Sequence, residues 1–155
     1  MKQSRGYPFF VYGTLLPEQP NAYLWADVVV EQVAAVLPNG RLYDCGPFPM
    51  LIEMGKSPVR GVVIEIEPEM YETVLERFDY LEGVDPKRPL AGAYRRVVRG
   101  VVTENGRLIE AWVYMGQKQF VVGLSIIESG DWLAHMQTRQ TAVNDWWYNI
   151  DRTPE

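Results

Sequence analysis

Apolar and polar residues alternate in several short segments of the chain. Between residues 59 and 67, Val62, Ile64 and Ile66 fall on one face and Glu65 on the other, the pattern of a strand. Further β-favouring runs occupy residues 7–12, 28–36, 94–102 and 107–115. Because the turn sequence TENG joins the last two, they are predicted to form an antiparallel hairpin, and an Asn39-Gly40 turn is predicted as well.

Residues 68–82 show the clearest helical pattern. Pro68 suits the first helical position and Gly83 the position just past the end. At about 100° per residue, one arc of the helix collects a core-facing stripe of Tyr71, Val74, Leu75, Phe78 and Leu81. The helix therefore covers the strands with one face and exposes the other, on which Asp79 is expected among the solvated charges.

The remaining segments complete a mixed α+β prediction. Residues 20–28 suggest a short helix, residues 45–54 an irregular connection into a short strand, and residues 128–155 a helical or extended tail. Short strands without repeated βαβ units favour a small, mostly antiparallel β-barrel of about six strands with flanking helices. We expect one domain over residues 1–155, with the barrel in 1–127 and the tail after it.

The charge of the chain restricts its partners. The formal net charge is −5 and the isoelectric point is about 5.0. Binding to nucleic acid normally requires a clustered basic face. The densest basic group, Arg95, Arg96 and Arg99, lies in an alternating strand pattern and is better explained as a strand face with paired arginines. We therefore expect no nucleic-acid partner.

Single residues limit other kinds of chemistry. Cys45 is the only cysteine and His135 the only histidine, so neither an internal disulfide nor a multi-cysteine metal site is expected. His135 lies far from any nucleophile signature and is expected to be structural or merely exposed. No apolar run approaches the roughly 20 residues of a membrane span. Lys2 and Arg5 precede a short apolar run, but no signal-like cleavage site follows; we expect a cytoplasmic protein.

Glu82 is an exception to the polar pattern of its helix. It lies four residues after Phe78 and points toward the apolar stripe. A carboxylate in the last turn meets the negative end of the helix dipole, at a cost of about 0.3–1 kcal/mol. Partial burial raises its pKa further, toward the range in which one carboxyl group can accept and return a proton. The alternative is that the helix end frays and Glu82 turns to water.

The turn after the first strand is a candidate partner of Glu82. Gly13 has no Cβ to hold a ligand away from the backbone, Thr14 adds a hydroxyl, and consecutive N–H groups at such a turn can bind an anion. Alternatively, Gly13 and Thr14 simply end the strand. Together, loop and acid suit a small zwitterion whose anionic end is held by amides while Glu82 transfers protons.

These residues resemble a known family. The segments FVYGTL at the first strand, GPFPML, VRGVVIEI, DYLEG at the helix end, YRR and EAWVY occur in the order of the gamma-glutamylcyclotransferase-like family. The resemblance covers roughly residues 8–115. The tail, with its Trp146-Trp147-Tyr148 cluster, carries little of it.

The resemblance implies both a compact barrel and a reaction. In this reaction the α-amino group of a γ-glutamyl residue attacks its own side-chain amide, releasing 5-oxoproline and an amine, and neither a metal nor a cofactor is required. The catalytic acid of the family corresponds to Glu82. The substrate-binding residues correspond to Tyr12, Gly13, Thr14, Leu15 and Tyr94, with Arg96 at the arginine of the Y-x-R element.

Two departures and two rival functions remain. The loop has Thr14-Leu15 where the glutathione-linked branch has Ser-Asn, which favours the γ-glutamylamine branch. Residues 83–94 form a long connection, which we expect to shape the entrance and to select the leaving amine. The rivals are a non-catalytic module that binds a small metabolite or a partner, and an amidohydrolase in which Glu82 activates water.

Overall fold

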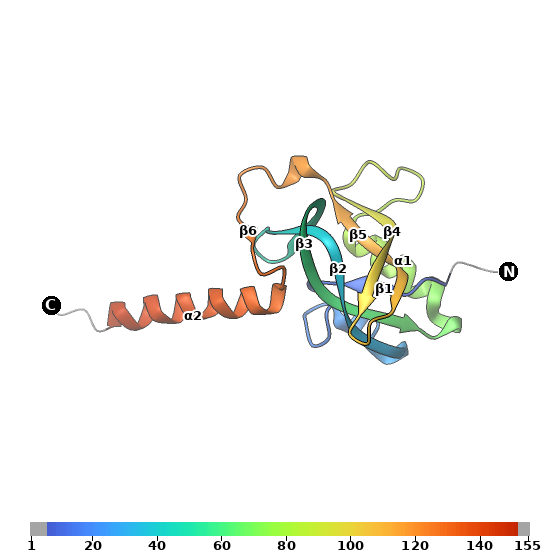
Figure 1. Ribbon diagram of the computed structural model, residues 1–155, viewed down its shortest axis with the longest axis horizontal. Helices are drawn as coiled ribbons and strands as arrows, with labels where there is room; N and C mark the ends of the chain where they lie inside the picture. The colour runs from blue at the N-terminus through green and yellow to red at the C-terminus, as the bar shows by residue number, and fades with distance from the viewer. Residues whose placement is uncertain (1–5, 152–155) are drawn as a thin grey trace.

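Five strands close into a barrel and a sixth pairs outside it (Figure 1). The computed structural model describes residues 6–151, with side chains as far as Trp146. Lys2, Arg5 and the side chains of Trp147 and Tyr148 lie outside the described residues. The strands are β1 (Phe9–Val11), β2 (Val29–Asp44), β3 (Pro49–Ile66), β4 (Tyr94–Thr103), β5 (Leu108–Gly116) and β6 (Ile126–Ile127). The α-helices are α1 (Tyr71–Glu82) and α2 (Trp132–Asp151).

The barrel closes because its two longest strands pair along most of their length. The strand order is β3-β1-β5-β4-β2, and β2 also pairs with β3, while β6 pairs with the far end of β2. Only the β1–β5 pairing is parallel among the described strands, with Phe9 opposite Trp112; the β4–β5 hairpin is antiparallel, as predicted. The mixed α+β barrel predicted from the sequence is thus confirmed.

Two local predictions were wrong because β2 and β3 are longer than their sequence patterns suggest. Asn39-Gly40 does not form a turn: it lies within β2, at a register shift opposite Ser57. The irregular connection expected over residues 45–54 extends only to Phe48. An 18-residue strand that includes Pro58 begins at Pro49. Register shifts of this kind bend a strand and increase its twist, so they help the long pair to curl around the barrel.

The predicted helix 68–82 is present in two parts. A 3-10 turn (Pro68–Met70) leads into α1, and Gly83 ends the helix in the left-handed conformation with φ 72°. The expected short helix near Pro20 is instead a pair of 3-10 helices, η1 (Ala22–Leu24) and η2 (Ala26–Val28). A further 3-10 turn, η4 (Lys118–Phe120), follows β5.

Helix α1 packs its apolar stripe on the barrel. Val74 and Phe78 are fully buried, and the Phe78 ring meets the Phe9 ring edge to face at a centroid distance of 4.9 Å. Because Phe9 belongs to β1, this contact fixes the helix beside the strand whose end carries the Gly13 turn. The last turn of α1 and the end of β1 therefore lie near each other.

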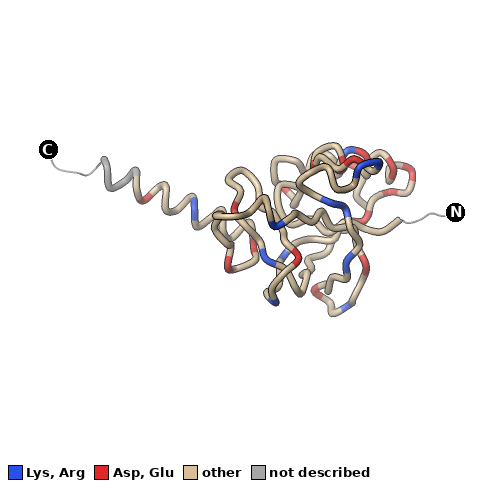
Figure 2. The backbone as a smooth tube through the Cα atoms, turned by 90° about the horizontal axis from the view of Figure 1, so that it is seen from above, with Lys and Arg blue, Asp and Glu red and all other residues tan. Residues whose placement is uncertain are grey.

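Helix α2 begins on the barrel and then runs away from it, as both views show (Figures 1 and 2). Its first turns are fixed by the buried Trp132, by a 2.7 Å contact between His135 Nε2 and an Asp44 carboxylate oxygen, and by Arg139, which donates to the Gly46 carbonyl. His135 thus has the structural contact expected of it.

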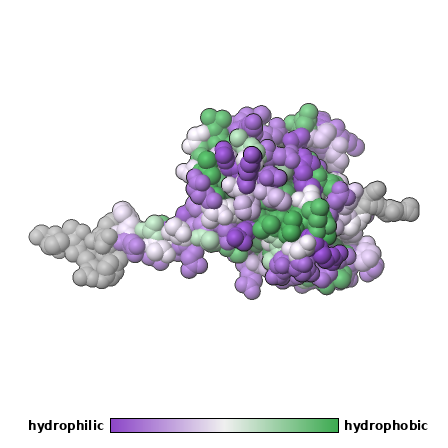
Figure 3. All heavy atoms as spheres, viewed as in Figure 1, coloured by the Kyte–Doolittle hydropathy of each residue, from purple (hydrophilic) through white to green (hydrophobic). Residues whose placement is uncertain are grey.

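On the face seen in Figure 3, hydrophilic residues cover much of the surface, and hydrophobic residues gather in patches on the barrel. Of the arginines predicted to be paired, Arg96 binds Asp79 and Arg99 binds Glu53. No helix within residues 6–151 is both long enough and apolar enough to cross a membrane.

Candidate active site

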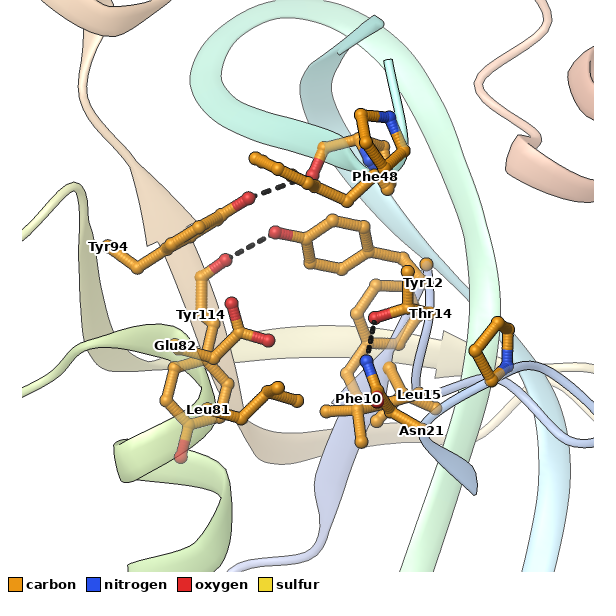
Figure 4. A pocket seen from close by; sticks show the side chains of 15 residues that line it. Phe10, Tyr12, Thr14, Leu15, Asn21, Phe48, Leu81, Glu82, Tyr94 and Tyr114 are labelled. Carbon is orange, nitrogen blue, oxygen red and sulfur yellow. Dashed lines mark hydrogen bonds between the residues drawn. The ribbon is translucent and has the colours of Figure 1, made fainter. Parts of the chain in front are cut away.

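A cavity of about 370 Å³ lies between the end of β1 and the end of α1 (Figure 4). The start of β3, the start of β4 and the last part of β5 complete its wall. All of the predicted site residues line it: Tyr12, Gly13, Thr14, Leu15, Glu82 and Tyr94. The structure therefore brings together two segments that are about 70 positions apart in sequence, as the proposed pairing of loop and acid requires.

The Glu82 carboxylate points into this cavity (Figure 4). Burial raises the pKa of Glu82 from 4.5 to about 7, because the surrounding protein solvates a charge less well than water does. Within residues 6–151, no side chain or main-chain group forms a hydrogen bond or ion pair with the carboxylate. Glu82 is thus a half-buried residue whose carboxyl group can exist in either protonation state near neutral pH.

Tyrosines surround Glu82 and remain uncharged. The Tyr12 hydroxyl donates to the Tyr114 carbonyl at 2.6 Å, and the Tyr94 hydroxyl donates to the Pro49 carbonyl at 2.9 Å. Burial raises the pKa of the Tyr12, Tyr94 and Tyr114 phenols, and the nearby Glu82 charge raises each further. All three hydroxyls donate hydrogen bonds within the protein, that of Tyr114 to Asp79. These rings therefore shape the cavity, while Glu82 remains the group that titrates.

The turn after β1 is fixed by contacts on its outer side. The Leu15 carbonyl accepts a hydrogen bond from the buried Trp25 indole at 2.8 Å, and the Leu16 N–H closes the turn on the Gly13 carbonyl at 3.0 Å. The main-chain N–H groups of Gly13, Thr14 and Leu15 donate to no acceptor in the described chain. They are therefore available to a bound anion, as in other backbone nests.

Two details of this turn differ from the expectation or add to it. A Cβ on Gly13 would lie 2.7 Å from the ring of Pro49, so the glycine makes room for the protein's own cavity wall rather than for a ligand. The Thr14 hydroxyl accepts a hydrogen bond from the Asn21 side-chain amide at 2.9 Å (Figure 4). That contact leaves the hydroxyl proton of Thr14 free to donate to a ligand.

Asp79 was wrongly expected to be solvated. It is buried one turn before Glu82, and Arg96 binds both of its oxygens, at 2.8 and 3.2 Å. The Tyr114 hydroxyl donates to the same carboxylate at 2.7 Å, and the Arg96 guanidinium stacks 4.2 Å above the centre of the Trp112 ring. This network ties the last turns of α1 to β4 and β5 and holds the backbone that carries Glu82.

Sequence reasoning missed several residues of the cavity wall. Leu81 was expected in the core, but it lies at the cavity, 38% exposed; Phe48, on the segment before β3, is 39% exposed. Asn21 also lines the cavity, and no local sequence pattern indicates its bond to Thr14. The connection between Glu82 and Tyr94, proposed to shape the entrance, contributes no lining residue in the described structure.

Comparison with known proteins places the chain in a family. The sequence model of the family described as "Gamma-glutamyl cyclotransferase, AIG2-like" matches residues 9–134. The chain belongs to this family. The match extends from β1 to the first turn of α2 and so includes every strand and both halves of the cavity.

Other members of the gamma-glutamyl cyclotransferase, AIG2-like family cover most of the chain. The gamma-glutamylcyclotransferase family protein YtfP of Escherichia coli K12 is 32% identical over 124 residues, which are 80% of this chain and 94% of the relative. The counterpart from Citrobacter rodentium is also 32% identical over 124 residues and covers 80% and 93%.

Solved structures show the same fold. The solution structure of ytfP from Escherichia coli superposes with a TM-score of 0.54 at 31% identity, covering 81% of this chain and 96% of that protein. The crystal structure of YkqA from Bacillus subtilis superposes with a TM-score of 0.64 at 22% identity and covers 88% of this chain. This chain spans 43% of YkqA, so that likeness concerns the fold of one part of a longer protein.

Proposed function

We propose that the protein is a γ-glutamyl-amide cyclotransferase that converts a γ-glutamyl amide into 5-oxoproline and a free amine. The observation that carries the proposal is the position of Glu82. Its carboxyl group has a pKa of about 7 and lies in a cavity whose opposite wall presents unpaired N–H groups at Gly13, Thr14 and Leu15. Membership of the family supports the reaction class.

The proposed reaction begins with a proton transfer. An α-ammonium group is not a nucleophile, so the Glu82 carboxylate first accepts one of its protons. The resulting amine attacks the γ-carbonyl carbon of the same substrate, and a carbon–nitrogen bond closes the five-membered ring. Because the attack is intramolecular, holding the substrate folded in the cavity supplies much of the acceleration.

The second half of the reaction returns the proton. Protonated Glu82 gives its proton to the nitrogen of the scissile amide, the original carbon–nitrogen bond breaks, and the amine leaves. Over the full cycle the attacking nitrogen loses two protons and the departing amine gains two, so it leaves as an ammonium ion. A group with a pKa near the working pH is well suited to accept and donate in turn.

The turn after β1 supplies the stabilisation of negative charge. The substrate α-carboxylate and the oxyanion that forms at the γ-carbon both need hydrogen-bond donors. The N–H groups of Gly13, Thr14 and Leu15, with the Thr14 hydroxyl, are donors of the cavity wall that the described chain leaves unused.

Product analysis tests this proposal. The purified protein is incubated with a panel of γ-glutamyl amines and γ-glutamyl amino acids, and 5-oxoproline and glutamate are quantified. We expect 5-oxoproline and free amine in equal amounts. Release of glutamate would identify an amidohydrolase instead, and binding of glutamate-like ligands without turnover would identify a binding module.

The role of Glu82 is tested by Glu82→Gln, which keeps the shape of the side chain but removes its titratable proton. We expect turnover to fall by at least about 10²-fold, while ligand binding and the folded structure persist. Glu76→Gln on the exposed face of α1 is the matched control and should retain full activity. Full activity in a folded Glu82→Gln variant would contradict the mechanism.

A further inference from the structure

We propose that Arg139 of α2 is a positioning residue for the substrate cavity, because it holds the β2–β3 connection that carries Pro47 and Phe48 into the cavity wall. This connection comprises residues 45–48 and joins the end of β2 to the start of β3. Its effect on substrate binding rests on the proposed function, whereas the position of Phe48 can be measured without any substrate. Arg139 lies beyond residues 9–134, so the family match assigns it no role.

The β2–β3 connection forms one part of the cavity wall. Pro47 and Phe48 both line the cavity, and Phe48 is 39% exposed. The centre of the Phe48 ring lies 6.5 Å from that of the Tyr94 ring, and Figure 4 shows Phe48 on the side of the cavity away from Leu81. Glu82 belongs to a different element, so a displacement of the connection changes the cavity wall while Glu82 stays in place.

The two ends of the connection are held by the barrel. The Asp44 N–H donates to the Ser125 carbonyl at 2.9 Å, directly before the connection begins. The Cys45 N–H donates to the Phe48 carbonyl at 3.0 Å and so brings the two ends together. Neither contact reaches the peptide group between residues 46 and 47, which forms the middle of the connection.

Arg139 supplies the contact to this middle part. Its Nη1 atom donates to the Gly46 carbonyl at 2.7 Å, and this carbonyl belongs to the peptide group that joins Gly46 to Pro47. The same Nη1 atom lies 3.3 and 3.4 Å from the two Asp44 carboxylate oxygens. In the part of the chain that the structure describes, no other side chain bonds to the Gly46 carbonyl. Arg139 therefore fixes the orientation of the peptide group from which Pro47 and Phe48 continue into the wall.

Asp44 holds Arg139 at this point. Its carboxylate accepts a hydrogen bond from the Gly46 N–H at 2.7 Å and lies 2.7 Å from His135 Nε2. Burial raises the pKa of Asp44, but the hydrogen bonds that it accepts and the charge of Arg139 hold it below its usual value. The carboxylate is therefore charged at neutral pH and pairs with the guanidinium. Gly46 is thus fixed on both sides, by Asp44 at its N–H and by Arg139 at its carbonyl.

This contact acts on the cavity more than on the stability of the fold. The Arg139 side chain is 39% exposed, and ion pairs at such positions add little to the stability of a whole protein. The buried Trp132 still holds the start of α2 on the barrel. Loss of the Arg139 contact therefore frees the middle of the connection in a protein that remains folded. A ligand must then order Phe48 as it binds, and this ordering lowers its affinity.

Fluorine NMR tests the position of Phe48 directly. 4-Fluorophenylalanine replaces Phe48 alone, and spectra are recorded without ligand. We expect one narrow resonance in the otherwise native protein, and a resonance that is shifted or at least about twofold broader in Arg139→Gln. Gln140→Ala is the matched control, because it removes an exposed side chain from the next position of α2, and its resonance should stay unchanged.

Kinetics test the consequence for the substrate. With a γ-glutamyl amide that the native protein turns over, Arg139→Gln should raise KM by at least about threefold and leave kcat within about twofold. Arg139→Lys keeps a donor for the Gly46 carbonyl and should recover about half of the change in KM or more. The urea midpoints of both variants should equal that of the native protein, because the ion pair is exposed.

Several outcomes would overturn the inference. An unchanged fluorine resonance in folded Arg139→Gln, or an equal change in Gln140→Ala, would show that Arg139 does not set the position of Phe48. An unchanged KM would separate the contact from substrate binding, and a lysine variant no better than Arg139→Gln would contradict the role of the bond to Gly46. If no γ-glutamyl amide yields 5-oxoproline, the proposed function fails, and the ligand-free spectra still decide the inference.

Discussion

The role proposed for Glu82 comes with a cost to the stability of the folded protein. Its folded-state pKa of about 7 lies above the ordinary 4.5, so the folded protein holds this proton more tightly than the unfolded chain does. The stability that this proton contributes is fully present below pH 4.5 and is lost as the pH rises through 7. At higher pH the folded protein holds a negative charge that is poorly solvated, and this lowers its stability.

This linkage predicts a pH-dependent effect of Glu82→Gln on stability. The uncharged amide avoids the burial of a carboxylate, so the variant should gain stability relative to the native protein as the pH rises from 5 to 8. The gain should reach at most about 3 kcal/mol. Urea unfolding at both pH values measures it, with exposed Glu76→Gln as control. A difference that does not change with pH would contradict the raised pKa.

Helix α1 shows how an element positions a single side chain. Gly83 ends the helix, and the Val84 N–H returns to the Asp79 carbonyl at 2.8 Å, so the backbone on either side of Glu82 is fixed. The Asp79 side chain holds the same turn to Arg96 and Tyr114 on two strands. The α1 terminus can therefore present Glu82 in one orientation without direct contact to its carboxylate.

The Asp79–Arg96 pair should behave as a coupled unit. Asp79→Asn leaves a largely buried guanidinium without its counter-charge and should destabilise the fold by about 3–5 kcal/mol. Arg96→Gln should have a similar effect, while the double variant should cost clearly less than the sum. Unfolding measurements on all three give the coupling energy, and strictly additive effects would show that the pair has no energetic role. Glu72→Gln, on the exposed face of α1, is the control.

At the scale of the whole molecule, barrel closure depends on close contact between β1 and β3. A Cβ on Gly61 would lie 2.3 Å from the Val11 carbonyl oxygen and 2.8 Å from the Phe10 ring. Both neighbours belong to β1, directly before the turn that lines the cavity. The same contact that closes the barrel thus sets the position of the loop.

Gly61→Ala should therefore disturb both the fold and the site. We expect a loss of about 1–3 kcal/mol in unfolding free energy and a parallel loss of ligand affinity, because β1 must shift to admit the methyl group. Gly100→Ala is the matched control: it is also a strand glycine, and its added Cβ would meet only the end of the exposed Leu108 side chain. Equal effects of the two variants would show that the close approach is not limiting.

The sequence by itself determined the local features of this protein. Alternation marked the hairpin, Gly83 marked the end of α1, and the helical period pointed Glu82 inward, because each depends on residues a few positions apart. Only the tertiary structure decided the length of β2 and β3, the burial of Asp79 and the contact of Gly13 with Pro49. Each of these involves partners distant in the chain. Both levels contribute to the pKa of Glu82. The helical period directs the side chain inward, and the enclosing barrel supplies the desolvation that raises the pKa to about 7.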